Sequence, residues 1–498
     1  MVSDTMSDQD GQQPSAAIVP APQDGVQPAP SPSSIARLDE GYTDRTETEM
    51  EALADHIGFG EKHRVRGMPY VAQPAPGYDV HGVWHSFGAA QRSGYASHAI
   101  GLHWALMKLG AQTQLIPHRN IDIDIDELPV DRAERISSWL GNAVGHPHLV
   151  VLSWPPDVAA EMANLGPPLI PYCAFEATKI SDLIVSVCNN DAFREIWVVS
   201  QFVHEAMVNS GIDAMKVRTV PPVLFGGPWP IGARDVHLSR AARSRPVTSD
   251  APFVFGAFGT WHKRKGVHEL IRAYFSSFKR SEPVTLRLHT SPLGARLTIK
   301  QFREKVIAEI AEIATEFGDY EFPASKKMPH IRLDLGTDES DREVIEWLAQ
   351  LDCYANASFG EGLGIPQIWS KALGVPMVST SFGAIGDIIL ASDSDIDNET
   401  LVPSKLGPVP VEMMKMNAMF CRESCWGDYE VADLAKQLRV AFERGRVFDE
   451  RGAEYVQREY DGRKTVEVLS RAFRELMPAS ELKAVAPALT QSNVLTAG

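Results

Sequence analysis

The chain has 498 residues, of which 44% are hydrophobic and 22% charged, and a formal net charge of −16 at pH 7. This length exceeds what one hydrophobic core accommodates and predicts two or three domains of about 150 residues each. The composition is that of an ordinary soluble globular protein, and the acidic balance argues against a surface that coats nucleic acid.

Membrane and cysteine patterns exclude other classes of protein. No apolar run approaches the ~18 residues of a membrane span, and the N-terminus lacks a charged region followed by an apolar one, so we expect a cytoplasmic protein with no transmembrane segment. The five cysteines include no CxxC pair, which disfavours a disulfide framework. Cys421 and Cys425 could share a helix face, but no second pair of ligands lies nearby in sequence, so no metal site is expected there.

Both ends of the chain have the composition of disordered tails. Residues 1–40 are rich in Pro, Ala, Gln and Ser, and residues 478–498 are similar. Such segments bury too little apolar surface to offset the entropy lost on ordering. We therefore expect the folded part of the chain to lie between them.

Residues 78–222 alternate strand-like and helical patterns, which is typical of a parallel α/β sheet. A helix is expected from about Ser97, and Ser200 is placed to N-cap the helix after the last strand. Residues 223–252 hold few periodic apolar positions and are expected to link two domains. The expected strands of the first domain are 80–84, 113–117, 148–154, 169–175 and 195–200.

Residues 253–427 repeat the pattern. Apolar residues at i, i+3, i+4 and i+7 predict a helix over 267–278. The simplest architecture is an α/β fold of two Rossmann-like domains, with a ligand at the carboxyl ends of the strands in the cleft between them. The expected strands of the second domain are 253–259, 284–290, 330–336, 353–358 and 375–380.

The stretch FGEGLGIP, residues 359–366, places one carboxylate, Glu361, among three glycines at a strand-to-helix turn. Glycine lets backbone N–H groups approach an anion at the helix N-terminus, because it has no Cβ to obstruct the approach. The acid beside such a turn must bind something other than the anion. Lys263-Arg264-Lys265 precede another helix and favour phosphate binding over a merely solvated face.

Three segments together resemble the retaining glycosyltransferases of the GT-B fold, in the large family 4-like group that includes bacterial mannosyl- and glucosyltransferases and sucrose synthases. SFGEGLGIPQIWSKALGVPMVSTSFGAIG (358–386) is similar to the family's donor-site segment, and FGTWHKRKGVHELIRAYFSSF (258–278) to its strand, loop and helix with a basic pair. Residues 174–222 resemble the closing part of its N-terminal domain. The resemblance spans roughly residues 78–475, with the segments in the expected order.

The resemblance implies a transferase that moves a sugar from a nucleotide-diphosphate sugar to an acceptor hydroxyl with retention of configuration and without a metal or cofactor. It also implies that the helices of residues 428–477 pack back on the N-terminal domain. In the family, the residue matching Glu361 binds a hydroxyl of the donor sugar, and Arg264 and Lys265 would neutralise the diphosphate. The other residues implied in substrate binding are the glycine-loop pair Gly94 and Tyr95 and the donor-turn residues Gly362, Leu363 and Gly364.

The sequence departs from the family pattern at three places. Trp369 stands where the family has a second acid that holds the ribose, and its one N–H donor cannot accept ribose hydrogen bonds. Because the ring can stack, Trp369 is kept among the residues expected to bind substrate. Thr260 replaces an arginine before the basic pair. Ser153 to Asp157 occupy the place of the family's usual histidine.

Other interpretations stay open from the sequence. Two interpretations of Glu176 are equally supported, a contact with substrate and a structural hydrogen bond. Asp122, Asp124 and Asp126 lie on one side of an extended segment and suggest a metal site. The alternative interpretation of this segment is an exposed acidic turn. His98, His146 and His148 are candidate acid–base groups, but surface or structural histidines are commoner.

Two alternative functions remain at this stage. One is a glycosyltransferase-like sugar or nucleotide-binding protein that has lost turnover, and the other is a glycosyltransferase that acts on modified DNA bases. The acidic balance disfavours nucleic acid as the partner. The identity of a glycan, lipid or protein acceptor is not readable, because acceptor specificity in this fold lies in variable loops.

Overall fold

The computed structural model describes most of the chain between residues 82 and 476. The tails expected at 1–40 and 478–498, together with the acidic stretch 121–127, lie outside the described residues. The described ranges are 82–87, 94–109, 112–117, 147–153, 156, 169–226, 231–292, 297–336 and 341–476.

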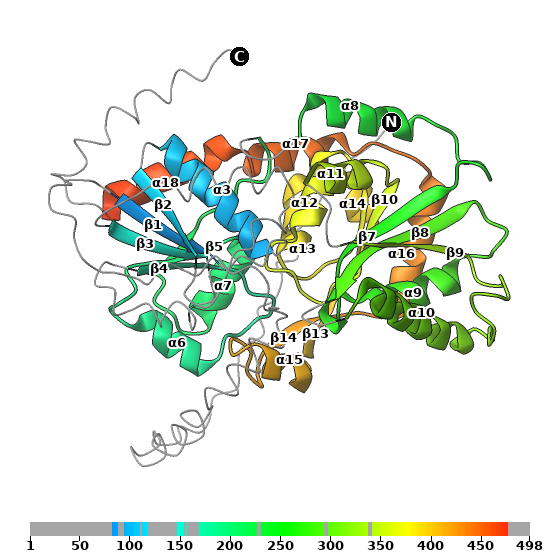
Figure 1. The fold of residues 1–498 in the computed structure, drawn as a ribbon, viewed down its shortest axis with the longest axis horizontal. Coiled ribbons are helices and arrows are strands. Elements are labelled where there is room, and N and C mark those ends of the chain that lie inside the picture. Colours follow the sequence, from blue (N-terminus) through cyan, green and yellow to red (C-terminus); the bar gives the residue numbers. More distant parts are fainter. Residues whose placement is uncertain are drawn as a thin grey trace, which may run out of the picture. The chain divides into compact units, whose positions relative to one another are not determined.

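The N-terminal half forms a six-stranded sheet in which every described pair of neighbours is parallel. The strand order is β2-β1-β3-β4-β5-β6, and α3, α6 and α7 pack beside it (Figure 1). Its strands are β1 (Gly82–Phe87), β2 (Gln112–Pro117), β3 (Pro147–Ser153), β4 (Leu169–Cys173), β5 (Ile196–Val198) and β6 (Val217–Thr219).

The C-terminal half forms a second parallel sheet, with the order β12-β11-β10-β7-β8-β9. The first strand of this half, β7, lies in the middle of the sheet, with β8 and β9 added on one side and β10, β11 and β12 on the other. The order of addition therefore reverses between β7 and β10, which is the switch point of a Rossmann fold. The expected α/β fold with two Rossmann-like halves is confirmed. The strands are β7 (Phe253–Trp261), β8 (Val284–Pro292), β9 (His330–Leu335), β10 (Cys353–Asn356), β11 (Met377–Thr380) and β12 (Leu401–Val402).

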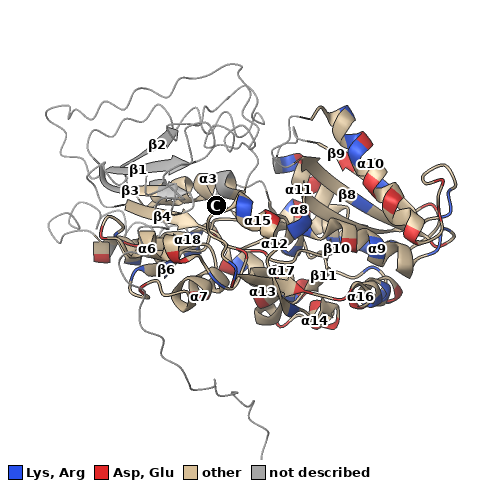
Figure 2. Cartoon of the chain, turned by 90° about the horizontal axis from the view of Figure 1, so that it is seen from below, with Lys and Arg blue, Asp and Glu red and all other residues tan. Residues whose placement is uncertain are grey.

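The helices follow the expected patterns at most positions. Ser200 caps α7 as predicted, because its side chain accepts a hydrogen bond from the Val203 amide. α10 buries an apolar stripe that includes Phe302, Val306 and Ile310, while its charged residues include basic ones only in the N-terminal part of the helix (Figure 2). The N-terminal helices are α3 (Gly94–Lys108), α6 (Asp182–Asn189) and α7 (Gln201–Asn209). Those from α8 to α14 are α8 (Ala233–Arg243), α9 (Val267–Ser277), α10 (Ile299–Glu316), α11 (Asp341–Ala349), α12 (Ile365–Ala372), α13 (Ala384–Ser392) and α14 (Asp395–Glu399).

The range expected to be a linker, 223–252, contains the 11-residue helix α8. Apolar periodicity does not reveal this helix, because its buried positions are Asp235, Ser239 and Arg243. Ser239 donates to the Leu373 carbonyl at 2.6 Å, so polar contacts rather than apolar burial hold the helix in place.

The C-terminal helices divide between the two halves. α16 (Val431–Arg444) packs on α9, and α17 (Glu450–Glu459) packs on α12 and α13, all in the C-terminal half. α18 (Gly462–Leu476) lies along α3 of the N-terminal half (Figure 1). The remaining elements are α15 (Val411–Met416) and the antiparallel hairpin of β13 (Lys405–Pro408) and β14 (Cys425–Asp428). Within the described ranges, no helix is both long and apolar enough to cross a membrane.

Candidate active site

An acid and two cations meet at the switch point of the C-terminal sheet. Arg264 and Lys265 lie in the short helix η2 (Lys263–Lys265) that follows β7, and Glu361 follows β10. Lys265 Nζ lies 2.5 Å from Glu361 Oε1, and Arg264 Nη1 lies 3.0 Å from Glu361 Oε2. The carboxyl ends of neighbouring strands at a switch point are where α/β sheets bind ligands, so this cluster lies at the expected place.

Backbone contacts hold the two turns of this cluster together. The Phe359 amide donates to the Arg264 carbonyl at 2.8 Å, and the Ser358 hydroxyl donates to the same oxygen at 3.0 Å. Gly266 follows Lys265 with a left-handed φ of 61°, and a Cβ there would lie 1.9 Å from the Ala357 carbonyl oxygen. Only glycine permits this approach, so the position of the cations depends on the sequence of the turn.

Glu361 is ionised at neutral pH in spite of its burial. Its side chain is only 7% exposed, and burial by itself raises the pKa of the carboxyl. The charges and hydrogen bonds of Lys265 and Arg264 outweigh burial and lower this pKa to about 2. The same interactions hold both cationic groups at the Glu361 carboxylate.

The N-terminal half supplies Glu176 to the cluster. Its Oε1 lies 3.5 Å from Arg264 Nη2, an ion pair longer than a usual hydrogen bond. The backbone around Glu176 also touches the donor turn, since a Cβ on Gly360 would lie 2.1 Å from the Glu176 carbonyl oxygen. Ser200, the N-cap of α7, donates its hydroxyl to the Gly362 carbonyl at 2.6 Å.

The glycine turn itself opens α12. Gly364 is the N-cap of α12 and has a left-handed φ of 89°. Gly94 is the first residue of α3, and a Cβ on it would lie 3.8 Å from Ile365 Cδ1. The structure thus brings the predicted residues Gly94, Glu176, Arg264, Lys265, Glu361, Gly362, Leu363 and Gly364 close to one turn, whereas the side chain of Tyr95 lies outside the described residues.

Trp369 does not face this cluster through its polar group. The side chain is buried in α12, and its indole N–H donates to the Leu224 carbonyl at 3.0 Å. Leu224 follows β6 of the N-terminal half. The indole therefore joins the two halves of the chain at the position where the family has its second acid.

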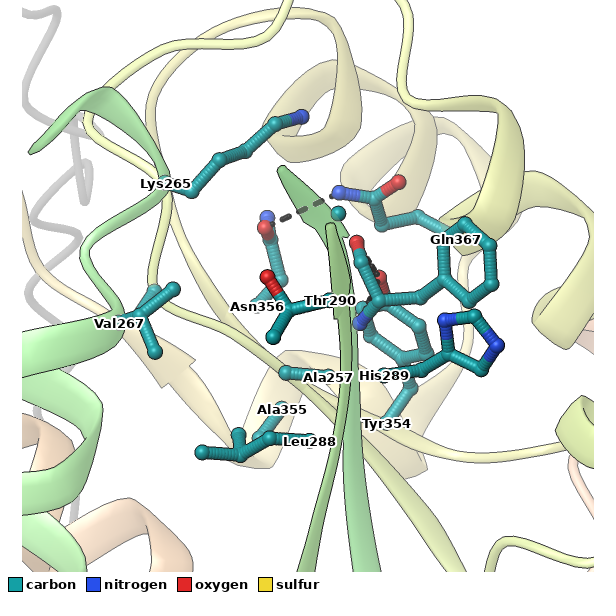
Figure 3. A pocket seen from close by; sticks show the side chains of 13 residues that line it. Ala257, Lys265, Val267, Leu288, His289, Thr290, Tyr354, Ala355, Asn356 and Gln367 are labelled. Carbon is teal, nitrogen blue, oxygen red and sulfur yellow. Dashed lines mark hydrogen bonds between the residues drawn. The ribbon is translucent and has the colours of Figure 1, made fainter. Parts of the chain in front are cut away.

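A polar pocket adjoins Lys265 at the carboxyl ends of β7, β8 and β10 (Figure 3). Gln367 donates to Asn356 Oδ1 at 3.2 Å inside it, as the dashed line in Figure 3 shows. Sequence analysis did not identify the polar residues of this pocket, because polar residues scattered over two strands and a helix form no local motif. Besides Lys265, they are His289, Thr290, Tyr354, Asn356 and Gln367.

Of the candidate histidines, the structure describes the side chain of His98. Burial lowers the pKa of His98, on α3, to about 3, so this imidazole is neutral near pH 7. His146 and the side chain of His148 lie outside the described residues. In the part of the chain that the structure describes, no three His, Cys, Asp or Glu side chains are grouped to hold a metal ion.

Two six-stranded Rossmann-like sheets, one in each half of the chain, are the arrangement of the GT-B fold. No protein-family profile matches the sequence, and no curated protein matches it.

Several solved structures share the fold. Alr3699/HepE of Anabaena, solved in complex with UDP and glucose, is 13% identical, with a TM-score of 0.52 over 79% of this chain and 100% of that one. The sucrose-phosphate synthase of Thermosynechococcus elongatus is 13% identical, with a TM-score of 0.50 over 80% of this chain and 99% of that one. A glycosyltransferase of Rickettsia africae is 12% identical, with a TM-score of 0.50 over 81% of this chain and 100% of that one.

Proposed function

We propose that this protein is a retaining glycosyltransferase that moves a sugar from a nucleotide-diphosphate sugar to an acceptor hydroxyl. The observation that carries the proposal is the cluster of Glu361 with Arg264 and Lys265 at the switch point of the C-terminal sheet. Structures with the same fold were solved with UDP and glucose, with UDP-glucose and with UDP-2-fluoro glucose, which makes UDP-sugars the first donors to test.

The cations have the chemistry that a departing diphosphate requires. When the bond between the anomeric carbon and the phosphate oxygen breaks, its electron pair stays on the diphosphate. Arg264 and Lys265, both largely buried, would stabilise that growing charge more strongly than water does. They take the part that a metal ion takes in other transferases, so the proposed reaction needs no metal.

Glu361 would orient the donor sugar. A carboxylate with a pKa of about 2 accepts hydrogen bonds at every physiological pH, and sugar hydroxyls donate them. The acceptor oxygen would attack the anomeric carbon from the face that the diphosphate leaves, and its proton would pass to an oxygen of the leaving phosphate. This geometry retains the anomeric configuration.

Product analysis tests the proposal. Wild-type protein is incubated with sugar nucleotides and candidate acceptors, and release of nucleoside diphosphate is measured together with the anomeric configuration of the product by NMR. We expect Glu361→Gln to lower the rate by roughly 10²–10³, the usual cost of removing one preorganised electrostatic group. The phosphate role expected of the whole basic run is proposed for Arg264 and Lys265 alone, because Lys263 is exposed. Lys263→Gln therefore removes a charge from the same turn and should leave the rate unchanged.

One observation favours a second candidate, a binding protein without turnover. Trp369 replaces the family's second acid and is hydrogen-bonded to Leu224, so it offers no acceptor for a ribose hydroxyl. Tight binding of a sugar nucleotide with neither transfer nor hydrolysis would support this candidate and contradict the proposed glycosyltransferase activity.

A further inference from the structure

The pocket beside Lys265 contains two buried polar atoms whose hydrogen-bonding capacity the protein does not meet. They are Thr290 Oγ1, at the end of β8, and Gln367 Oε1, in the first turn of α12. The two residues are 3% and 2% exposed, and both line the pocket. An unmet polar atom at this depth destabilises the protein, so a group that binds there and hydrogen-bonds to these atoms gains affinity.

The surrounding polar groups are engaged elsewhere. Asn356 accepts from Gln367 Nε2 at 3.2 Å and donates to Ser379 Oγ at 2.9 Å. Tyr354 exchanges hydrogen bonds of 3.1 Å with the backbone N–H and carbonyl of Phe258. This network fixes the amide of Gln367 with its oxygen unmet, and Figure 3 shows Gln367, Asn356 and Thr290 around the ends of the strands.

The two unmet atoms select a neutral hydroxyl. The oxygen of Gln367 only accepts, whereas the Thr290 hydroxyl both donates and accepts. A hydroxyl group has both of the complementary functions, a hydrogen to donate to Gln367 and an oxygen that accepts from Thr290. An ionised phosphate or carboxylate oxygen offers no hydrogen to Gln367 and would be repelled by it.

The pocket lies beside the ion cluster that is proposed to bind the donor. Lys265 lines the pocket and also pairs with Glu361 at 2.5 Å, so the ion cluster and the pocket share this side chain. Gly364 of the donor turn lies against the same amide, since a Cβ on it would be 3.1 Å from Gln367 Oε1.

We propose that Thr290 and Gln367 form a subsite that binds one hydroxyl of the sugar-nucleotide donor. This inference rests on the proposed function and deepens it by naming two residues that determine donor specificity. The hydroxyl belongs either to the transferred sugar or to the ribose, and these sources share the same chemistry.

Paired binding measurements test the subsite. Calorimetric titrations use UDP-glucose, or whichever member of a panel of UDP-, GDP- and ADP-sugars the wild type binds best, and the matching nucleoside diphosphate. We expect Thr290→Val and Gln367→Met each to weaken binding of the sugar nucleotide about tenfold, while Thr290→Ser keeps the hydroxyl and the affinity. Thr285→Val makes the same substitution earlier on β8, outside the pocket, and should change nothing.

Melting of the unliganded variants separates binding from folding. Thr290→Val removes an unmet polar atom and should melt at or above the wild-type temperature while binding donor less well. Gln367→Met removes an unmet oxygen but also the hydrogen bond from Gln367 Nε2 to Asn356, so its melting temperature should fall slightly, and its binding is measured well below that temperature. If the variants also bind the nucleoside diphosphate more weakly, the hydroxyl belongs to the ribose. If only their affinity for the sugar nucleotide falls, the hydroxyl belongs to the sugar.

Two results would overturn the subsite. Wild-type affinity in both apolar variants would mean that the pocket holds only a buried water, and the proposed function would stand. A wild-type protein that binds no member of the panel would overturn the proposed function and the subsite together.

Discussion

Trp369 donates its indole N–H to the backbone oxygen of Leu224, 3.0 Å away, and so joins α12 to the segment that follows β6. We expect Trp369→Phe to destabilise the protein by about 1–2 kcal/mol, because the Leu224 carbonyl loses its partner. Donor affinity should stay within about twofold of wild type. Thermal melting and titration with the donor check both expectations, and a large loss of affinity at an unchanged melting temperature would place the indole in the nucleotide site instead.

The pH dependence of stability reports the ionisation of Glu361. Its folded-state pKa of about 2 lies below its ordinary value of 4.5, so the carboxylate contributes roughly 3 kcal/mol that is fully present above pH 4.5 and is lost as the pH falls toward 2. We expect the difference in melting temperature between wild type and Glu361→Gln to shrink from pH 6 to pH 3. A difference that does not change with pH would contradict the ion cluster.

Gly266 sets the distance between the basic turn and β10. In Gly266→Ala the new Cβ would lie 1.9 Å from the Ala357 carbonyl oxygen and 2.6 Å from the Tyr429 hydroxyl. Gly318→Ala is the matched control, because Gly318 also has a left-handed φ, of 73°, but nothing within 4 Å of the added atom. Both variants share the strain of about 1–2 kcal/mol, and we expect Gly266→Ala to cost about 1–3 kcal/mol more. Equal losses of unfolding free energy in the two variants, measured by denaturant unfolding, would contradict the close approach of Gly266 to Ala357.

A buried ion cluster ties together three helices of the C-terminal half. Lys371 of α12 bonds Asp397 of α14 and lies 3.0 Å from Asp449, the N-cap of α17. Lys371→Met leaves two buried carboxylates without their cation and should cost about 3–5 kcal/mol. Burial already raises the pKa of Asp397, and losing the lysine raises it further, so the deficit should diminish at acidic pH.

Adding Asp397→Asn to Lys371→Met should recover part of this stability, because one of the unpaired charges is then removed. Denaturant unfolding of the single and double variants at pH 7 and pH 5 measures both effects. A single variant within 1 kcal/mol of wild type would show that the cluster does not stabilise the fold.

Local sequence signals predict the elements whose determinants are local. The glycines around Glu361 and the basic run ending at Lys265 mark two turns, and the resemblance adds that these turns share a ligand. The structure places them 2.5 Å apart through side chains 96 positions apart in sequence. The ion pair between Glu176 and Arg264 follows from packing of the two halves, which no local pattern encodes.

The elements that sequence analysis missed have determinants far away in the chain. α8 buries a polar face that finds its partners more than 100 residues on, as Ser239 does at Leu373. The hairpin of β13 and β14 pairs strands separated by α15. Trp369 was given a substrate role from its position in the motif, and its contact with Leu224, 145 residues earlier, is visible only in the structure.

We expect Arg264 and Lys265 to bind the diphosphate of a sugar nucleotide, and thermal unfolding against a panel of sugar nucleotides and free nucleoside diphosphates measures this binding. A ligand at about 100 times its Kd adds roughly 2.7 kcal/mol to the stability of the native state. We expect the wild type and Lys263→Gln to show the same upward shift with one sugar nucleotide, and Arg264→Gln with Lys265→Gln to show none. A shift that survives in the double variant, or wild-type protein that no member of the panel stabilises, would contradict the account.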